Sequence, residues 1–204
     1  KNPNGYDLQI GLTQVRKCVV SDMDNDKSPD IMLFSSGYDG MPFPGDSLWI
    51  FYPKDLKYQY FNQDIGYFHG GATGDINNDG LIDIVAYSGG SAAIPVHPTC
   101  YINKGGQKFE LSNKVFKNFT QNDNYYTVEL FDINDDAKLD LFLGSSKTLR
   151  VIPNINGDFD RSKAINFSSK EFILANGVIP KFSQALIRWV ASVNVKGPCS
   201  ASII

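Results

Sequence analysis

The sequence has little cysteine, little histidine and no long apolar run. Its three cysteines, Cys18, Cys100 and Cys199, form no CxxC pair, which argues against a zinc or redox motif. No stretch approaches the roughly 18 consecutive apolar residues of a membrane-spanning helix, so no membrane insertion is expected. The net charge is −3, from 19 basic and 22 acidic residues, and no basic run is present. A nucleic-acid partner therefore has no electrostatic footprint in this chain.

An internal repeat is what the sequence does contain. Three segments align on their acidic residues, and they read VVSDMDNDKSPDIMLF, GATGDINNDGLIDIVAY and VELFDINDDAKLDLFLG. The first aspartates of their loops are Asp22, Asp75 and Asp132, which are 75 − 22 = 53 and 132 − 75 = 57 residues apart. A period of this size is typical of arrays of supersecondary units, propeller blades among them.

Each repeat contains the same succession of short apolar runs and turns. A β-favouring run follows each acidic loop, at residues 31–34, 84–87 and 141–143. Two further runs separated by turn residues come next, at 48–52 and 58–61, at 100–102 and 109–111, and at 149–152 and Phe159. Together with the apolar residues before the loop, this makes four short strands per repeat. We therefore expect an all-β fold of four-stranded antiparallel β-propeller blades.

The whole chain, residues 1–204, is expected to form a single, partial β-propeller. The three clear repeats predict blades at about residues 11–68, 69–125 and 126–182. A degenerate fourth copy falls at residues 183–204, where Ser192 takes the anchor position and Lys196 the fifth position. The Lys196 ammonium group would then occupy the place of a cation. An unrelated tail is the alternative for this last segment.

The polar residues of each repeat follow a 1, 3, 5, 9 spacing around a tight turn. Alternate side chains of such a loop can point inward, while the carbonyl of position 7 and a carboxylate at position 9 complete about six oxygen ligands, which suits calcium. The absence of His and Cys at these positions disfavours zinc and copper. The predicted metal ligands are Asp22, Asp24, Asp26, Ser28 and Asp30 in the first loop, Asp75, Asn77, Asp79, Leu81 and Asp83 in the second, and Asp132, Asn134, Asp136, Lys138 and Asp140 in the third.

Mutual repulsion between the loop carboxylates also favours a bound cation. Carboxylates about 4 Å apart repel by roughly 4 kcal/mol per pair at an effective dielectric constant near ~20. Turns with outward-pointing Asp and Asn side chains are the alternative. An EF-hand is excluded because it requires a carboxylate at its twelfth position, where Leu33, Ala86 and Leu143 stand. We expect up to three Ca²⁺ ions with a structural rather than a catalytic role.

The acidic loop followed by an apolar strand, repeated over residues 14–165, resembles the FG-GAP/VCBS repeats of integrin α-chain propellers and related extracellular propellers. The resemblance implies calcium ligands at the four polar positions of each loop. It also implies that the loops connect the first and second strands of each blade, opposite the usual ligand-binding face. Because propellers of this family usually have seven blades, other chains or segments would complete this one, or the chain is a fragment.

Two loops depart from the family pattern, which usually has Gly at position 6. Only Gly80 matches, and Lys27 and Ala137 stand at this position in the other two loops. If the position needs a positive φ, these two loops carry strain, and the first and third sites are expected to bind calcium more weakly.

Other chemistry-bearing residues give weaker signals. His69 and His97 have no nucleophile motif beside them, so no catalytic triad is predicted, and both are expected to be ordinary surface or turn histidines. Asp46, Asp64 and Glu129 fall outside the loops and are expected to be solvated.

Long connections at residues 37–45 and 89–98 often carry function in proteins. Tyr38, Phe43 and Trp49, in or next to the first of them, offer a stacking surface for a sugar or a protein, or else they pack across neighbouring blades. Asn118 and Asn166 begin N-glycosylation sequons, which fit a secreted protein.

The sequence thus predicts a calcium-stabilised module that is extracellular or at the cell surface. We expect it to bind a protein or glycan partner and not to be an enzyme. A carbohydrate-binding lectin and a polysaccharide-degrading propeller enzyme are the alternatives, because a fold does not fix a function. A pocket lined by acidic residues outside the three loops would favour the enzyme.

Overall fold

The computed structural model describes residues 14–168 apart from 39, 42, 91–93 and 146–147. Strands dominate this part of the chain, and its helices are the single 3-10 turns η1 (Asn113–Val115) and η2 (Arg161–Lys163). Among these described residues, no helix has the length and apolar character needed to cross a membrane. The expected degenerate repeat at 183–204, with Ser192, Lys196 and Cys199, lies outside the described residues.

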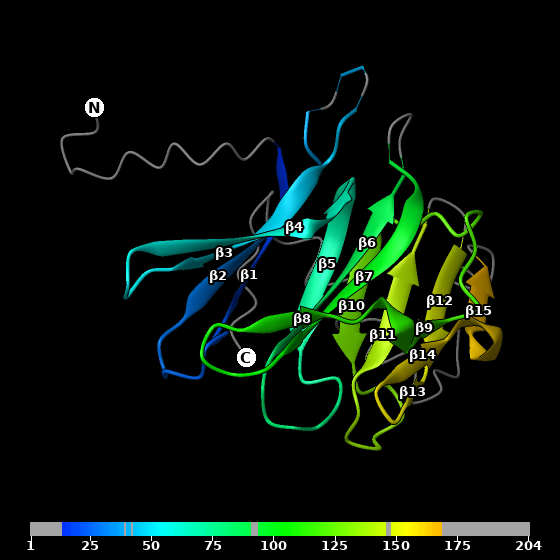
Figure 1. Cartoon of the computed structure of the whole chain (residues 1–204). Coiled ribbons are helices and arrows are strands. Elements are labelled where there is room, and N and C mark those ends of the chain that lie inside the picture. The colour runs from blue at the N-terminus through cyan, green and yellow to red at the C-terminus, as the bar shows by residue number, and fades with distance from the viewer. Residues whose placement is uncertain (1–13, 39, 42, 91–93, 146–147, 169–204) are drawn as a thin grey trace, which may run out of the picture.

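Three four-stranded antiparallel sheets follow one another along the chain and fan out side by side (Figure 1). Blade 1 comprises β1 (Val15–Ser21), β2 (Asp30–Ser35), β3 (Asp46–Tyr52) and β4 (Lys57–Gly66). Blade 2 comprises β5 (Phe68–Gly74), β6 (Asp83–Gly89), β7 (Val96–Asn103) and β8 (Phe109–Leu111). Blade 3 comprises β10 (Thr127–Phe131), β11 (Asp140–Gly144), β12 (Thr148–Ile152) and β15 (Ile165–Ser168). The predicted all-β class with four-stranded antiparallel blades is confirmed.

A small additional sheet changes the expected outer strand of blade 3. The strands β13 (Asn154–Ile155) and β14 (Asp158–Asp160) form a hairpin, and β14 also pairs in parallel with β9 (Phe116–Lys117). The placement of Phe159 in the fourth strand of blade 3 is therefore wrong. Phe159 lies in β14, is fully buried and stacks on Phe116 with the ring centroids 6.0 Å apart. An apolar run marks a strand but does not say which sheet the strand joins.

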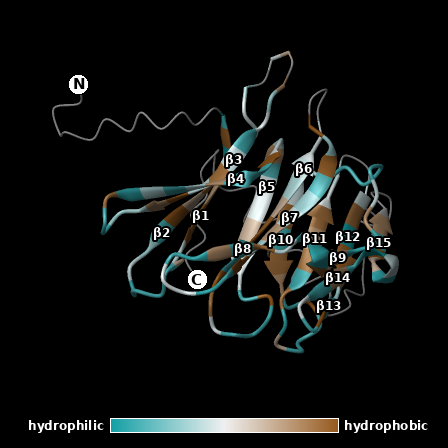
Figure 2. Cartoon of the chain, viewed as in Figure 1, coloured by the Kyte–Doolittle hydropathy of each residue, from teal (hydrophilic) through white to brown (hydrophobic). Residues whose placement is uncertain are grey.

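The core lies between the blades, in two clusters of buried side chains. Alternation along each strand sends successive residues to opposite faces of the sheet. In β6, Ile84 and Ala86 pack in the cluster between blades 1 and 2, whereas Val85 and Tyr87 pack in the cluster between blades 2 and 3. Every residue of β6 is accordingly buried, and hydrophilic residues are frequent in the loops at the lower edge (Figure 2).

Blades 1 and 2 approach each other closely at one glycine of β5. A Cβ atom at Gly71 would lie only 1.8 Å from the ring of Phe34, which is fully buried in β2. No real side chain fits at that distance, so the first strand of blade 2 requires glycine here for the large aromatic ring of blade 1 to pack against its backbone.

Candidate functional site

The three acidic loops occupy equivalent places in the three blades. Each connects the first strand to the second: residues 22–30 join β1 to β2, residues 75–83 join β5 to β6, and residues 132–140 join β10 to β11. We refer to them as loops 1, 2 and 3. All three lie along one edge of the fan, the lower edge in Figure 1, and the connections from β2 to β3 and from β6 to β7 lie at the upper edge.

The backbone of each loop turns through two residues in the left-handed region. At position 4, φ is between 59° and 62°, and at position 6 it is between 63° and 84°. These residues are Asn25, Asn78 and Asp135 at position 4, and Lys27, Gly80 and Ala137 at position 6. Asn and Asp tolerate this conformation better than other non-glycine residues, which accounts for position 4. Position 6 does need a positive φ, so Lys27 and Ala137 carry the strain that the sequence predicted for such a conformation.

Hydrogen bonds to the backbone hold the side chains of each loop over the turn. In loop 2, the Asp75 carboxylate accepts bonds from the N–H groups of Asp79 and Gly80 at 3.1 and 2.7 Å. The equivalent distances are 3.0 and 2.9 Å in loop 1, and 3.0 and 2.8 Å in loop 3. The side chain at position 3 accepts a further bond from position 5 in every loop, at 3.0 to 3.2 Å. The carboxylates are thus gathered over the turn rather than splayed outward.

Position 7 continues this pattern, but with its amide. Ser28, Leu81 and Lys138 each donate their backbone N–H to the carboxylate at position 5, at 2.7, 2.9 and 3.0 Å. At position 5 of loop 1, Asp26 also accepts a bond from Lys54 at 2.7 Å, and this cation lowers the pKa of Asp26.

The aspartate at position 9 is the buried member of each loop. Asp30, Asp83 and Asp140 are at most 2% exposed, because each is the first residue of a strand inside the blade. One carboxylate oxygen of each accepts the backbone N–H of position 2, at 2.8 to 3.2 Å. This bond closes the loop across its base.

Burial makes ionisation of these aspartates unfavourable. It raises the pKa of Asp30 and of Asp83 to about 6, and it raises the pKa of Asp140 as well. The neighbouring loop carboxylates add repulsion in the same direction, and the backbone N–H donors only partly compensate. A buried carboxylate beside others of the same charge is stabilised by a bound cation.

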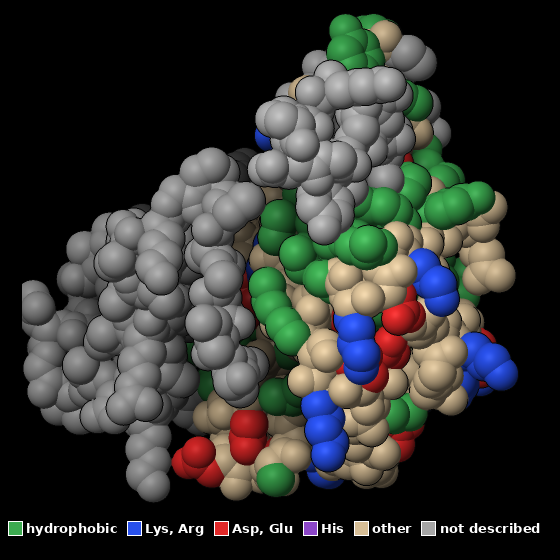
Figure 3. Space-filling view, turned by 90° about the vertical axis from the view of Figure 1, so that its left-hand side faces the viewer, with side chains coloured by type: hydrophobic (Ala, Val, Ile, Leu, Met, Phe, Trp, Pro, Cys, Tyr) green, Lys and Arg blue, Asp and Glu red, His purple; other side chains and the backbone are tan. Residues whose placement is uncertain are grey.

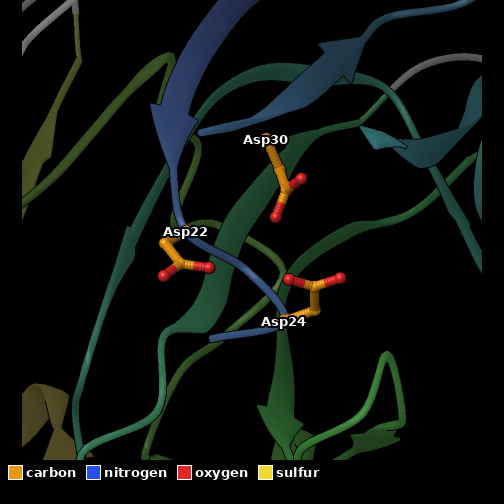
Figure 4. A group of neighbouring side chains, drawn as sticks. All are labelled: Asp22, Asp24 and Asp30. Carbon is orange, nitrogen blue, oxygen red and sulfur yellow. The ribbon is translucent and has the colours of Figure 1, made fainter. Parts of the chain in front are cut away.

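In loop 1, three carboxylates converge most closely. Asp22, Asp24 and Asp30 each present an oxygen, and these oxygens lie within 4.8 Å of one another. Figure 4 shows the three side chains around a shared space, with Asp30 entering from the start of β2 and Asp22 from the end of β1. An all-oxygen, multiply charged set of this kind fits a hard divalent cation.

Loops 2 and 3 carry an amide at position 3 in place of the third carboxylate. Asn77 donates to Asp79 at 2.9 Å, and Asn134 donates to Asp136 at 3.2 Å. The predicted residues of these loops are therefore also brought together, with one negative charge fewer at positions 1, 3, 5 and 9 than in loop 1.

Two asparagines that the sequence analysis missed tie neighbouring blades together beside the loops. The side-chain amide of Asn103, at the end of β7, donates to the carbonyl of Met23 in loop 1 at 2.7 Å and to the carbonyl of Ile82 in loop 2 at 2.9 Å. The backbone N–H of Asn103 donates to the buried carboxylate of Asp83 at 2.8 Å. One residue thus bonds loop 1 to loop 2.

Asn154 repeats this arrangement one blade later. Its amide donates to the carbonyls of Ile76 and Leu139 at 2.8 and 3.1 Å, and its N–H donates to Asp140 at 2.8 Å. We call Asn103 and Asn154 the amide clamps. The shared signal was available in the sequence, because each asparagine stands at or just after the end of the third strand of its blade and a glycine stands three residues later, as in Asn103-Lys-Gly-Gly106.

Polar groups away from the loops include one pair that was expected to be ordinary. The solvated assignment of Asp64 is wrong, because its half-buried carboxylate accepts bonds from His97 and Thr99, each at 2.8 Å, and from Asn113 at 3.0 Å. These contacts join β4 of blade 1 to blade 2. His97 is accordingly not a plain surface histidine but part of an inter-blade hydrogen-bond group.

A pocket of about 320 Å³ lies toward the edge opposite the loops, next to blade 3. Asp123, which is 3% exposed, lies at this pocket and accepts bonds from Arg150 at 2.7 Å and from Arg161 at 2.6 Å. The two guanidinium groups and Thr120 outweigh burial and lower the pKa of Asp123. Tyr126 lines the same pocket and is 44% exposed.

The aromatic residues singled out in the sequence have separate surroundings. Phe43 packs edge-to-face against Tyr67, at the start of blade 2, with the ring centroids 6.2 Å apart. Trp49 packs against Tyr60 within blade 1 at 5.1 Å. Tyr38 is 59% exposed.

Comparison with known families gives a match that includes part of the candidate site. Residues 75–143 match the family model described as an FG-GAP-like repeat. The matched segment begins at Asp75, position 1 of loop 2, and ends within β11, so it contains loops 2 and 3. No curated protein gives a significant match to the chain. The predicted resemblance is confirmed for this segment, which is similar to an FG-GAP-like repeat.

Proposed function

We propose that this chain is a calcium-stabilised, non-catalytic module of an extracellular β-propeller that binds a protein or a glycan. The observation that carries the proposal is the threefold repetition of one acidic loop, each with a buried aspartate at its base, along a single edge of the blades. Calcium would neutralise the carboxylates of each loop and hold the first two strands of the blade together.

The ligands for calcium would be the side chains at positions 1, 3, 5 and 9 and the carbonyl at position 7. The oxygen-only character of these groups and the closely spaced oxygens of Asp22, Asp24 and Asp30 support this assignment. Exposure of both sequon asparagines, Asn118 and Asn166, supports an extracellular location, since glycosylation needs an accessible side chain.

Calcium removal is the direct test of the proposal. A ligand present at about 100 times its dissociation constant stabilises a protein by about 2.7 kcal/mol, which corresponds to roughly 5–10 °C in melting temperature for a domain of this size. We expect a rise of this order in excess calcium over chelator, measured by calorimetry, and a smaller rise in magnesium. The Asp75→Asn and Asp132→Asn double variant should lose part of the rise. An unchanged transition in chelator would contradict the proposal.

The partner would bind at the edge opposite the loops. There, Tyr126 and the Arg150 guanidinium offer an aromatic surface and a hydrogen-bond donor beside the pocket, which suits a sugar as well as a peptide. Binding to a glycan array would favour the lectin, and binding only to proteins would favour the adhesion module. The Asp123 carboxylate is bonded to two arginines, which supports a non-catalytic role for the acidic residue of this pocket.

Further blades from this or other chains would complete the propeller. On the outer face of blade 1, Ile31 and Phe51 are register partners, as Ile84 and Tyr101 are in blade 2. Blade 1 buries the blade-2 pair. Hydrophobic side chains are visible on the side of the molecule that lies to the left in Figure 1 (Figure 3). This face therefore suits contact with another blade. If sedimentation at high concentration showed only monomers, a second copy of this chain would not be the source of that blade.

A further inference from the structure

One position breaks the repetition of the amide clamps. In each blade, one residue of the third strand is the register partner of an equivalent residue of the second strand; these third-strand residues are Phe51, Tyr101 and Ile152. Two residues further along the chain, blade by blade, stand Pro53, Asn103 and Asn154. The backbone N–H of each asparagine donates to the position-9 aspartate of its own blade. Proline has no N–H, so blade 1 cannot make this bond.

Asp30 consequently keeps one oxygen for another partner. Its second oxygen accepts the N–H of Met23 at 2.8 Å, and this is the one hydrogen bond of the Asp30 carboxylate within the described part of the chain. Asp30 is 2% exposed, and its side chain faces Asp22 and Asp24 (Figure 4). A carboxylate oxygen that accepts no hydrogen bond from the described residues and lies close to two other carboxylates is available as a ligand for a cation.

Loop 1 also carries more charge than its two counterparts. Asp24 takes the place of Asn77 and Asn134, so positions 1, 3, 5 and 9 of loop 1 are all aspartates. Greater ligand charge raises the calcium affinity of oxygen sites. Lys54, bonded to Asp26 at 2.7 Å, offsets part of this charge, but both side chains are at the surface, where such pairs contribute little.

Blade 2 contacts loop 1 at two places. The Gln107 amide, from the hairpin between β7 and β8, donates to Asp24 at 2.8 Å and to Asp55 at 3.2 Å. Asn103 donates to the carbonyl of Met23 at 2.7 Å. Two adjacent residues near the start of loop 1, Met23 and Asp24, are therefore held by the neighbouring blade, and the orientation of Asp24 depends on that blade being in place.

We propose that loop 1 is the tightest of the three calcium sites and that its occupancy is coupled to the docking of blade 2 on blade 1, with Gln107 and Asn103 as positioning residues. This inference rests on the proposed function. It reverses the order expected from glycine at position 6. The strain at Lys27 does not lower affinity, because hydrogen bonds to Asp22 and Asp26 already hold the turn in this conformation and its cost falls on folding rather than on binding.

The variant Pro53→Ala tests the vacant oxygen. It adds a backbone N–H at the place from which Asn103 and Asn154 donate in the other blades, and it also removes the proline ring and its constraint on φ. We expect the tightest dissociation constant in a calcium titration with a chromophoric chelator to weaken by about tenfold, the effect of a hydrogen bond to a charged group. Asp24→Asn gives loop 1 the pattern of loop 2 and should weaken the same constant, and Asn77→Asp should strengthen a weaker one. If Pro53→Ala folds poorly, Asp24→Asn and Asn77→Asp still test the ranking of the three sites.

Gln107→Ala tests the coupling, and Asn156→Ala is its matched control. Asn156 also has a positive φ and an amide side chain, in the hairpin between β13 and β14, but it makes no hydrogen bond to loop 2 in the described structure. Both variants therefore lose an amide at a strained position. We expect Gln107→Ala to weaken the tightest constant by about fivefold, since one charge-assisted hydrogen bond is lost, and Asn156→Ala to leave it unchanged.

The outcomes separate this inference from the proposed function. If the unmodified chain binds no calcium, the proposed function fails. If calcium binds but Pro53→Ala and Asp24→Asn both leave the tightest constant unchanged, the function stands and the ranking of loop 1 is overturned. If Gln107→Ala and Asn156→Ala behave alike, the coupling to blade 2 is overturned.

Discussion

The two edges of the blades are held together by different chemistry. At the loop edge, uncharged side-chain amides donate the hydrogen bonds between blades, and Asn154 repeats for blades 2 and 3 what Asn103 does for blades 1 and 2. Toward the opposite edge, the contacts are charged and do not repeat: Asp64 meets His97 between blades 1 and 2, and Asp123 meets two arginines at blade 3. Repetition thus preserves the shared geometry of the acidic loops, while the other edge differs from blade to blade.

The largest expected effect comes from removing the charge of Asp123. Because its side chain is only 2% exposed, Asp123→Asn leaves the Arg150 and Arg161 guanidinium groups without their common counter-ion. We expect a loss of about 3 kcal/mol in the free energy of unfolding, the low end for breaking a buried ion pair because both arginines are partly exposed. Urea denaturation measures it. If Asp123→Asn lost less free energy of unfolding than an amide clamp variant, the charged contacts of this edge would not be the stronger ones.

The amide clamps should have an intermediate effect, and an equal one. Asn154→Ala leaves the buried carbonyls of Ile76 and Leu139 without their side-chain donor, and Asn103→Ala does the same one blade earlier. Each should cost about 1–3 kcal/mol in chelator. The backbone N–H bond to the buried aspartate remains in both variants. If the two variants lost very different free energies of unfolding, the two asparagines would share a geometry but not a contribution to stability.

The smallest effect concerns pH and the pair of Asp64 and His97. Burial opposes both charges, but the hydrogen bond and charge of Asp64 raise the pKa of His97 above 6.5, and His97, Asn113 and Thr99 lower the pKa of Asp64 below 3.8. The histidine contribution is complete below pH 6.5 and is lost as pH rises through the raised pKa. The aspartate contribution is present above pH 3.8 and is lost as pH falls through the lowered pKa.

The pair should therefore stabilise the fold most between pH 3.8 and 6.5. We expect the free energy of unfolding of the wild type to be about 0.5–1 kcal/mol greater than that of His97→Asn at mildly acidic pH, as for a partly exposed ion pair. At alkaline pH, the difference should be smaller. Thermal melts of both proteins across this range give the comparison. A difference that grows toward alkaline pH would have the wrong sign for this pair.

The repeated part of the molecule could be predicted from the sequence, and the unrepeated part could not. The spacing of Asp75, Asn77, Asp79 and Asp83 predicts a loop because the hydrogen bonds that shape the turn are local, each within seven residues along the chain. By contrast, the bond from Asn103 to Met23 spans 80 residues. Whether such residues meet depends on how two blades dock, which no local pattern encodes.

The same limit explains the remaining errors. Phe159 has the apolar character of a strand, and the parallel pairing of β14 with β9 is set by a segment about 40 residues earlier, so its sheet could not be read from its own neighbourhood. Asp64 looks solvated in sequence because its partners, His97, Thr99 and Asn113, belong to the next blade.

The direction of the amide clamps has a consequence for biosynthesis. Each asparagine donates to a carbonyl in the blade that precedes its own in the chain, from Asn103 to Met23 and from Asn154 to Ile76. During N-to-C-terminal translation, the acceptor of every clamp leaves the ribosome before its donor. Each new blade thus emerges after the blade that supplies its acceptor carbonyl, so blades can dock one after another during synthesis, before the chain is complete.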